Sequence, residues 1–479
     1  MREELHPRAP PPAFVTYPPT APAPGSARAQ RFTYDELEAD PHLGELRCRY
    51  SLDGQGFVER VGFEGVDPQA WALPGVEAAA RWVFLLLGVS YYKAGAPPVV
   101  DLGDLALSAP DVEFLRQYYI DGLGEFAYRN GIDLSELEIR SRSPLTSPPP
   151  APSLSAEQVG TGALRPLIPF GGGIDSIVTT ELVRHGARGG DDGERTALFV
   201  VSKAGDRFAA IEAPAAVTGL PILRAERELD RRILRSSQLG FLNGHVPVTG
   251  MISAIAVLAA LLHGRDAVVM SNEASASAGN LDLGDRVVNH QWSKGLAFET
   301  AFRDALVRNR VPVEYFSLLR SASELWVGRH FAALTRYHGV FRSCNRAFYV
   351  DAALRMDHWC GECDKCCFVD LILAPFMERA RLEEVFDDRE PLANDALADR
   401  FRTLLGISPS PKPFDCVGDP PECRAALRLT AERADRVGDT LVHRLLAELP
   451  DEPALTAQLL EPAGPNFVPD AYAPGDLLV

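Results

Sequence analysis

Hydrophobic and polar positions change period several times along the chain. Between Arg31 and Asp67 they alternate one by one, which is typical of half-buried strands. Asp53-Gly54-Gln55-Gly56 interrupts this alternation and is typical of a hairpin turn. The expected elements are strands at 47–52, 56–63 and 98–102 and helices at 75–87 and 108–129. Together they predict a small α+β domain over residues 31–143.

From residue 159 to about residue 400, strand and helix patterns follow one another in turn. Short apolar runs, typical of fully buried strands, are separated by helical patterns, the longest at 249–263. The expected strands lie at 164–170, 197–202, 221–225 and 267–271. This alternation predicts a doubly wound α/β domain, in which a parallel sheet carries helices on both faces.

Composition marks the other divisions of the chain. Residues 1–30 are rich in Pro and Ala and predict a disordered tail. Residues 144–158 begin with a Ser- and Pro-rich stretch and predict a linker. Residues 401–479 predict a helical C-terminal extension, with helical patterns at 422–436 and 439–449. Neither end of the chain indicates a particular chemistry.

A glycine loop follows the first strand of the predicted α/β domain. Gly171, Gly172 and Gly173 come directly before Asp175 and Ser176, which open a helical pattern. Glycines let the backbone approach an anion closely, and the free N–H groups of the helix start face the same point. Ser176 adds a hydrogen-bond donor, and Asp175 suits a Mg²⁺ ion carried by phosphates. The loop predicts a site for the phosphates of ATP; a simple tight turn is the alternative.

Polar residues also follow two other expected strands. Ser202 and Lys203 end one strand, and Asn272, Glu273 and Ser275 follow another. Carboxyl ends of parallel strands meet at one edge of a sheet, so these residues are expected around the glycine loop. The second group predicts a substrate-recognition loop in which Glu273 is an acid, a base or a metal ligand. A capped helix start is the alternative.

His290 and Lys294 belong to a second polar segment, Asn289-His290-Gln291-Trp292-Ser293-Lys294-Gly295. They are candidates for proton transfer or for binding substrate carboxylates, although a lone histidine is more often structural. Lysine is rare: only 5 of the 48 basic residues (Lys plus Arg) are lysines. Lys203 and Lys294 are therefore candidates for neutralising the charge of an α-phosphate.

Cysteines cluster in one short segment. Cys344 is followed by Cys360, Cys363, Cys366 and Cys367, which form two overlapping Cys-x-x-Cys units with one residue left over. Four thiolates suit a tetrahedral structural zinc ion, and Cys344, Cys360, Cys363 and Cys366 are the expected ligands. Reduced cysteines without metal, or a catalytic thiol, are the alternatives. Cys416 and Cys423 suggest no function.

Composition and charge narrow the classes of function. The chain has 479 residues, of which 46% are hydrophobic and 24% charged, as in ordinary globular proteins. Its formal net charge of −17 disfavours nucleic acids and anionic membranes as partners. We see no apolar run long enough to cross a bilayer and no signal-peptide pattern, so a cytoplasmic location is expected.

The glycine loop resembles the Ser-Gly-Gly-x-Asp-Ser loop of the PP-loop ATP pyrophosphatase superfamily, with Gly171 where that motif has Ser. Together with the segments 271–275, 343–346 and 359–366, it resembles the UDP-N-acetylmuramoyl-L-alanyl-L-glutamate epimerases over residues 30–400. These bacterial enzymes act in peptidoglycan precursor synthesis. The resemblance implies ATP and Mg²⁺ as cofactors and a UDP-MurNAc-dipeptide as the substrate.

The resemblance also implies a mechanism. A proton next to a carboxylate is very weakly acidic, and conversion of the carboxylate to an acyl-adenylate makes it easier to remove. A base then takes the α-proton, a proton returns on the other face, and hydrolysis yields D-Glu, AMP and pyrophosphate. Arg342 and Arg346 are candidates for binding the γ-carboxylate or the UDP diphosphate, with surface ion pairs as the alternative. The catalytic candidates are Asp175, Lys203, Glu273, His290 and Lys294, and Cys367 is a further possible base.

Two other classes of function fit the same loop. A PP-loop amide synthase, thiolase or deazaguanine-type enzyme would use the same adenylation and pass the activated group to nitrogen or sulfur. A non-catalytic module would bind the nucleotide without cleaving it. Cleavage of ATP together with formation of epimerised glutamate would distinguish the epimerase from both of these classes.

Overall fold

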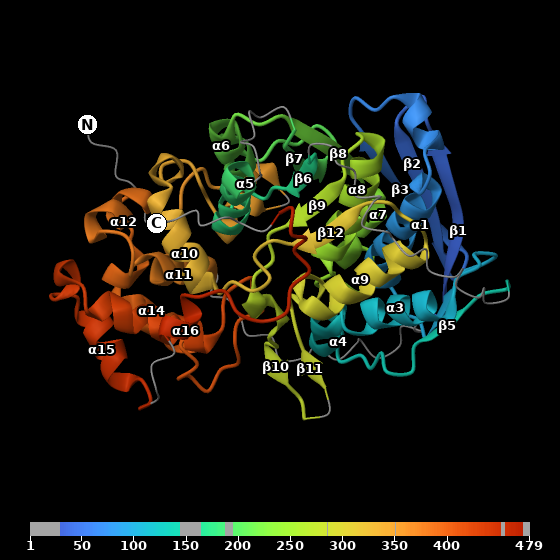
Figure 1. The fold of residues 1–479 in the computed structure, drawn as a ribbon. Coiled ribbons are helices and arrows are strands. Elements are labelled where there is room, and N and C mark those ends of the chain that lie inside the picture. The colour runs from blue at the N-terminus through green and yellow to red at the C-terminus, as the bar shows by residue number, and fades with distance from the viewer. Residues whose placement is uncertain are drawn as a thin grey trace, which may run out of the picture.

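We describe a computed structural model of the chain, over residues 29–143, 164–186, 195–284, 286–349, 351–451 and 456–472. The predicted linker at 144–158 lies outside these residues, and so does nearly all of the predicted tail at 1–30. The fold is mixed α/β, as the sequence predicts, and a ten-stranded sheet is its central element (Figure 1).

Five parallel strands form one half of this sheet, in the order β12-β9-β6-β7-β8. They are β6 (Pro166–Pro169), β7 (Ala197–Lys203), β8 (Ile222–Glu228), β9 (Ala267–Met270) and β12 (Glu314–Ser317). The chain runs outward from β6 to β8 and then returns to the other side of β6 to form β9 and β12. β6 and β9 therefore flank the point where the strand order reverses, which is where open α/β sheets bind ligands.

The N-terminal strands continue the same sheet in the order β3-β2-β1-β4-β5. They are β1 (Arg31–Asp40), β2 (Glu45–Leu52), β3 (Gln55–Phe63), β4 (Val99–Asp101) and β5 (Glu138–Arg140). β3 pairs with β8 in antiparallel fashion, and Glu59 of β3 forms an ion pair with Arg227 of β8 (2.7 Å). The sequence does not predict this junction. The division at residues 144–158 into two domains stays a prediction.

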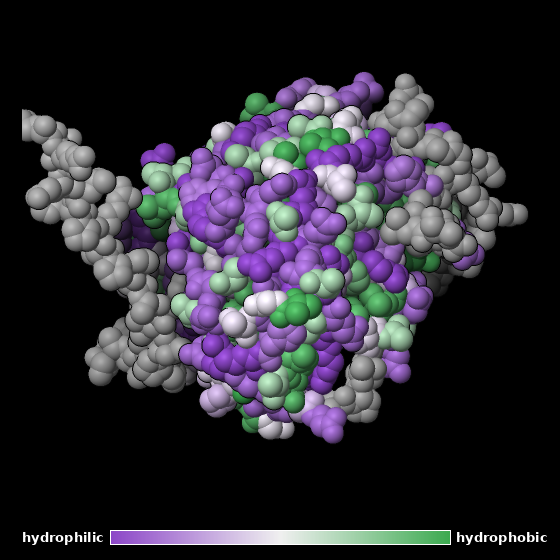
Figure 2. Space-filling view, turned by 90° about the vertical axis from the view of Figure 1, so that its left-hand side faces the viewer, coloured by the Kyte–Doolittle hydropathy of each residue, from purple (hydrophilic) through white to green (hydrophobic). Residues whose placement is uncertain are grey.

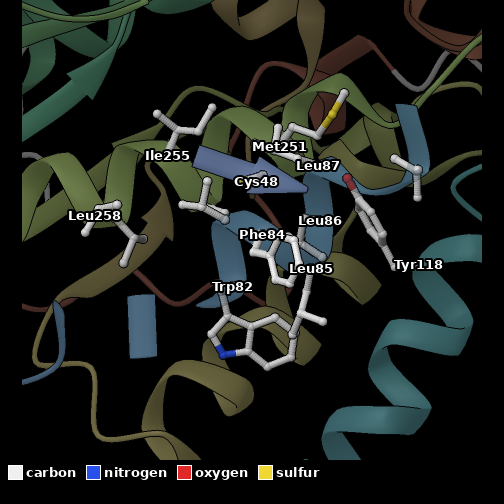
Figure 3. Packing of buried hydrophobic residues seen from close by; sticks show 14 of the residues in the cluster. Cys48, Trp82, Phe84, Leu85, Leu86, Leu87, Tyr118, Met251, Ile255 and Leu258 are labelled. Atoms are coloured by element: carbon white, nitrogen blue, oxygen red, sulfur yellow. The ribbon is translucent and has the colours of Figure 1, made fainter. Parts of the chain in front are cut away.

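Successive residues of the parallel strands enter two different hydrophobic cores. Leu167 and Phe199 belong to the first core, whereas Ile168 and Leu198 belong to the second. Figure 3 shows the first core, where α1 packs against α8. The helices on this face are α1 (Val76–Leu87), α3 (Ala109–Ile120), α8 (Val248–Leu262) and α9 (Leu296–Arg308). Those on the other face are α5 (Ile174–Gly186), α6 (Ala209–Thr218), α10 (Glu324–Ala333) and α11 (Asp364–Leu373).

Most expected elements form close to their predicted bounds, with one clear correction. The helix expected at 108–129 is two helices, α3 and α4 (Gly124–Asn130). Gly122 lies between them, where a Cβ would come within 2.9 Å of the Pro247 ring. Gly122 therefore leaves room for the segment that precedes α8 where the two helices meet, and sequence periodicity does not reveal such a contact.

C-terminal helices cover the side of the fold where α11 lies. They are α12 (Arg379–Val385), α13 (Ala398–Leu404), α14 (Pro420–Ala431), α15 (Thr440–Glu448) and α16 (Thr456–Leu459). Of these, α13 and α14 pack against α11, and α15 and α16 pack against them in turn. α14 begins with a capping box made by Asp419 and Glu422. Figure 2 shows the side on which α12 and α15 lie, and its surface is mainly hydrophilic with small, separate hydrophobic areas. Among the described helices, none has the length and apolar character required to cross a bilayer.

Candidate active site at the carboxyl ends of the parallel strands

Three carboxylates meet beyond the ends of β6, β9 and β12. Asp175, Glu273 and Glu324 each place a carboxylate oxygen within 4.8 Å of the others. Each also has a buried oxygen without a hydrogen-bond partner in the described part of the chain. Burial and the nearby Glu273 raise the pKa of Asp175 to about 6. Burial and the nearby Asp175 likewise raise the pKa of Glu324 well above its usual value. Such mutual repulsion favours a bound cation, and carboxylate oxygens are the ligands that Mg²⁺ prefers.

The glycine loop reaches this cluster from β6. Gly172 has a φ of +77°, and a Cβ there would lie 2.3 Å from the carbonyl oxygen of Ala210. A Cβ at Gly173 would lie 3.1 Å from Oγ of Ser343, whereas nothing lies within 4 Å of one at Gly171. Ser176 Oγ donates to the carbonyl oxygen of Gly173 (3.0 Å). Gly172 is therefore required for packing, while Gly171 leaves room for a ligand or a side chain.

Two lysines place positive charge near the carboxylates. Burial lowers the pKa of Lys294, but the surrounding anions, Cys416 and Glu273 foremost, outweigh burial and raise it. Lys365, at the start of α11, interacts with Glu324 and Asp175 in the same way. The third candidate, Lys203, is exposed at the end of β7, where its charge acts on Asp206.

A buried ion pair fixes the backbone on both sides of the cluster. Glu299 and Arg320 lie 2.7 Å apart with side chains only 2% exposed. Arg320 also donates to the carbonyl oxygens of Glu273 (2.9 Å) and Lys294 (2.6 Å). The pair therefore ties together the loop after β9 and the segment before α9, which carry two of the predicted catalytic residues.

The remaining predicted binding residues differ in how far they are buried. Ser202, Asn272 and Ser275 are buried, and the hydroxyls of both serines lack a partner within the described ranges. Arg342 is half-buried, and its Nε is buried without a partner there. Arg346 instead pairs with Glu362 (3.3 Å), beside the cysteine cluster. Unpaired buried polar atoms are costly, so their presence favours a polar ligand at this edge of the sheet.

Cys344, Cys360, Cys363 and Cys366 come together, as their spacing predicts. All four are buried, and their sulfur atoms lie within 4.8 Å of one another. Neighbouring sulfurs are 3.4 to 3.6 Å apart, close to the separation of about 3.8 Å that Zn–S bonds of 2.3 Å require. The backbone N–H groups of Glu362 and Cys363 donate to Cys360 Sγ (3.4 Å each), which stabilises a thiolate. The donor set therefore fits zinc, and Cys367 stays outside it.

His290 lies in a different group from the three carboxylates. Its Nδ1 donates to Oε2 of Glu125 in α4 (2.5 Å), and its ring interacts electrostatically with Cys416. The ring of His245 lies against that of His290, with their centroids 4.0 Å apart. Glu125, His245 and His290 also bring potential ligand atoms within 4.8 Å of one another. Glu125 already forms ion pairs with His290 and with Arg129 (2.5 Å). This group is therefore an ion-paired cluster rather than a metal site.

Two domain families match the chain, the MurL N-terminal domain over residues 25–318 and the MurL C-terminal domain over residues 340–460. The chain belongs to the MurL family. It is 39% identical to a Xanthomonas oryzae pv. oryzae protein named UDP-N-acetyl-alpha-D-muramoyl-L-alanyl-L-glutamate epimerase, over 87% of this chain and 89% of that protein. Proteins of the same name from Salinispora tropica and Micromonospora sp. are each 37% identical over 93% of this chain and 95% and 97% of their own. No solved structure matches this MurL-family chain. The family expected from the sequence motifs is confirmed.

Sequence reasoning assigns no role to four residues of these clusters. Glu324 follows a strand that the sequence pattern does not mark, and Glu125 lies in the N-terminal part of the chain. Lys365 carries a signal, because lysine is rare in this chain. Cys416 has none, because only the fold places its Pro-rich segment beside His290.

Proposed function

We propose that this chain converts the terminal L-Glu of UDP-MurNAc-L-Ala-L-Glu to D-Glu and that it cleaves ATP to AMP and pyrophosphate in doing so. The names of its relatives support the epimerisation. The observation that carries the ATP-dependent part is the cluster of unpaired carboxylates, Asp175, Glu273 and Glu324, next to the glycine loop. In this proposal, the five parallel strands form a PP-loop ATP pyrophosphatase domain.

The glycine loop and the N-terminus of α5 bind the phosphates of ATP in this proposal. Their backbone N–H groups and the helix dipole favour an anion there. Asp175, Glu273 and Glu324 would hold Mg²⁺, which, when bound, neutralises charge on the phosphates. Lys294 and Lys365 are half-buried cations near the same point and stabilise negative charge that develops at the α-phosphorus.

Adenylation solves a specific chemical problem. Removal of an α-proton next to a free carboxylate would place two negative charges side by side. The α-carboxylate of the substrate attacks the α-phosphorus of ATP, and pyrophosphate leaves. The resulting acyl-adenylate has no carboxylate charge, and its carbonyl accepts the electron pair of the Cα–H bond. After inversion, water attacks the carbonyl carbon, so one original carboxylate oxygen leaves with AMP.

Other residues bind the substrate or stabilise the fold in this proposal. Arg342, whose Nε has no partner in the described part of the chain, suits the γ-carboxylate or the UDP diphosphate. Ser275 and Asn272 bind the substrate from the loop after β9. Zinc, held by the four clustered cysteines, anchors the segment around Cys344 against α11 and has a structural role. We place the reaction in the cytoplasm, where ATP is available.

Incubation with ATP, Mg²⁺ and UDP-MurNAc-L-Ala-L-Glu tests the proposal. We expect AMP, pyrophosphate and D-Glu to form only when both ATP and the dipeptide are present. Asp175→Asn is expected to abolish all three, whereas Asp399→Asn, at an exposed carboxylate on α13, leaves them unchanged. D-Glu formed without ATP, or ATP cleaved to ADP and phosphate, would contradict the proposal.

A further inference from the structure

The segment around Cys416 is fixed from several distant parts of the chain. Asn280 donates to the carbonyl oxygen of Pro413 (2.6 Å), and Lys365 donates to that of Cys416 itself. The ring of Phe414 lies against Tyr128 and under the guanidinium of Arg129, both in α4. A cysteine in a loop between α13 and α14 therefore has a defined position, held by the N-terminal and central parts of the fold.

Cys416 lies beside His290 and Glu125, which are hydrogen-bonded to each other, because Gln291 next to His290 contacts Val417 next to Cys416. Glu125 accepts from Nδ1 of His290 (2.5 Å), and the charge of His290 acts on the thiol of Cys416. Burial raises the pKa of the Cys416 thiol, but Lys294 and His290 outweigh burial and lower it to about 7. A thiolate paired with a charged imidazole is the form in which a cysteine reacts with protons or electrophiles near neutral pH.

This group of residues lies beside the carboxylate cluster. Lys294 interacts electrostatically both with Cys416 and with Asp175, Glu273 and Glu324. Gln291 supplies an independent sign of a ligand: it is only 3% exposed, and its Oε1 has no partner in the described part of the chain. The Nε2 of Gln291 donates to the carbonyl oxygen of Val417, next to Cys416 (3.4 Å). An unpaired buried acceptor adjacent to the thiol indicates that a polar ligand binds there.

We propose that Cys416 is the catalytic acid–base that transfers the α-proton on one face of the glutamyl residue, with His290 and Glu125 as its positioning residues. The proposal rests on the proposed function, because it needs a substrate with an activated carboxylate. It gives a role to Cys416, for which the sequence suggests none. It also explains why the N-terminal part of the chain reaches the site through Glu125.

Every proton that moves in the step comes from and returns to a named group. The Cys416 thiolate forms an S–H bond as the Cα–H bond breaks, and the electron pair moves onto the activated carbonyl. The ammonium of Lys294 returns a proton to the opposite face of Cα, which reforms a C–H bond with inverted configuration. Transfer of the proton from the thiol to the neutral amine of Lys294 then restores both groups. No oxidant or reductant is needed.

Several charged groups act on this thiol from different elements. His290 and Lys294 come from the segment before α9, Lys365 from α11, and Glu125 from α4. His245, beside His290, is kept neutral near pH 7, because burial and the charge of His290 lower its pKa to about 4. Asp415 accepts from the backbone N–H of Cys416 (2.7 Å). The pH dependence of proton exchange therefore reports on the thiol together with His290.

Exchange of the α-proton in deuterated water tests this proposal separately from adenylation. We expect Cys416→Ala and Cys416→Ser to lower α-deuterium incorporation and D-Glu formation by at least about 100-fold. Both variants should still release AMP and pyrophosphate in the presence of the dipeptide. Cys423→Ala, at a buried cysteine on α14, is the control and should keep both activities. Wild-type protein that releases no AMP would refute the proposed function, whereas a Cys416→Ala variant with wild-type exchange would refute this inference alone.

Chemical labelling of the native protein covers the case in which the variants do not fold. Cys416 is half-buried, and the other seven cysteines, all within the described residues, are buried. Iodoacetamide near pH 7 should therefore label Cys416 first, and exchange should fall in proportion to the labelled fraction, measured by peptide mass spectrometry. His290→Gln should move the pH midpoint of labelling from about 7 toward the ordinary thiol value. Full labelling of Cys416 with unchanged exchange would overturn the proposal.

Discussion

The guanidinium of Arg320 lies 2.7 Å from the carboxylate of Glu299, and both side chains are buried. Arg320 carries its remaining hydrogen bonds to the carbonyl oxygens of Glu273 and Lys294. One buried pair therefore sets the distance between a carboxylate and a cation of the candidate active site. The backbone geometry of that site therefore depends on an ion pair between two residues outside the carboxylate cluster.

Removal of one partner of the Glu299–Arg320 pair should destabilise the fold strongly. Glu299→Gln leaves the charge of Arg320 buried without a counter-ion, and we expect a loss of about 3–5 kcal/mol in the free energy of unfolding. The measurement is urea unfolding at neutral pH. Glu138→Gln breaks an exposed pair with Arg140, and its cost should be much smaller because water screens that pair. Equal costs for the two variants would contradict the structural role of Arg320.

Two neighbouring glycines should respond in opposite ways to a side chain. Gly172→Ala forces a positive φ on alanine and places its Cβ 2.3 Å from the Ala210 oxygen, so we expect a loss of about 1–3 kcal/mol and of AMP formation. A Cβ at Gly171 meets nothing within 4 Å, and Gly171→Ser restores the serine of the superfamily motif. It should retain AMP formation and stability. If Gly171→Ser is inactive while Gly172→Ala is active, the phosphates of ATP bind elsewhere than at this loop.

The four clustered cysteines predict one tightly bound zinc ion for each chain. Elemental analysis of the purified protein measures it directly. Cys363→Ser should lose the metal and lower the unfolding temperature, because the remaining thiolates cannot complete a tetrahedral site. Cys367→Ala changes the adjacent buried cysteine and should keep the zinc. Metal-free protein of full stability would refute the zinc site.

Much of this site follows from the sequence, because its parts are local. The apolar run before Gly171, the glycines and the helix start at Asp175 lie in one segment, and period and composition are enough to predict them. Cys360, Cys363 and Cys366 are similarly close along the chain. The sheet edge that gathers Asp175, Ser202 and Glu273 follows from the rule for parallel strands.

Contacts between distant segments could not be predicted. The pairing of β3 with β8, and with it the Glu59–Arg227 ion pair, depends on how two predicted units meet. The role proposed for Cys416 depends on the segment before α9, which places Lys294 and His290 near it, and on α4, whose Glu125 holds His290. Local propensity and spacing carry no information about such placement.

The ion pair between His290 and Glu125 predicts a pH-dependent stability. Burial opposes the charge of His290, but hydrogen bonds with Cys416 and Glu125 outweigh it and raise its pKa to about 9. Because this value lies above the unfolded value of about 6.5, the stabilisation is complete below pH 6.5 and is lost as the pH rises through 9. Glu125, whose pKa is lowered despite burial, stabilises the fold above its unfolded value and loses this contribution as the pH falls.

Urea unfolding over a pH series measures this effect. The stability difference between wild type and His290→Gln should be greatest near about pH 6 and shrink above about pH 9. His245→Gln is the matched control. Since the pKa of His245 is lowered to about 4, its neutral form stabilises the fold above about pH 6.5, and that contribution is lost as the pH falls. A His290→Gln difference that grows above pH 9 would contradict the ion pair.

The central claim is that ATP activates the substrate carboxylate beside Asp175, Glu273 and Glu324. Substrate labelled with ¹⁸O in the α-carboxylate of its glutamate tests it most directly, in a single turnover with ATP and Mg²⁺. We predict one ¹⁸O atom in the phosphate group of the AMP released and D-Glu as the amino-acid product. D-Glu accompanied by AMP without ¹⁸O would contradict this account.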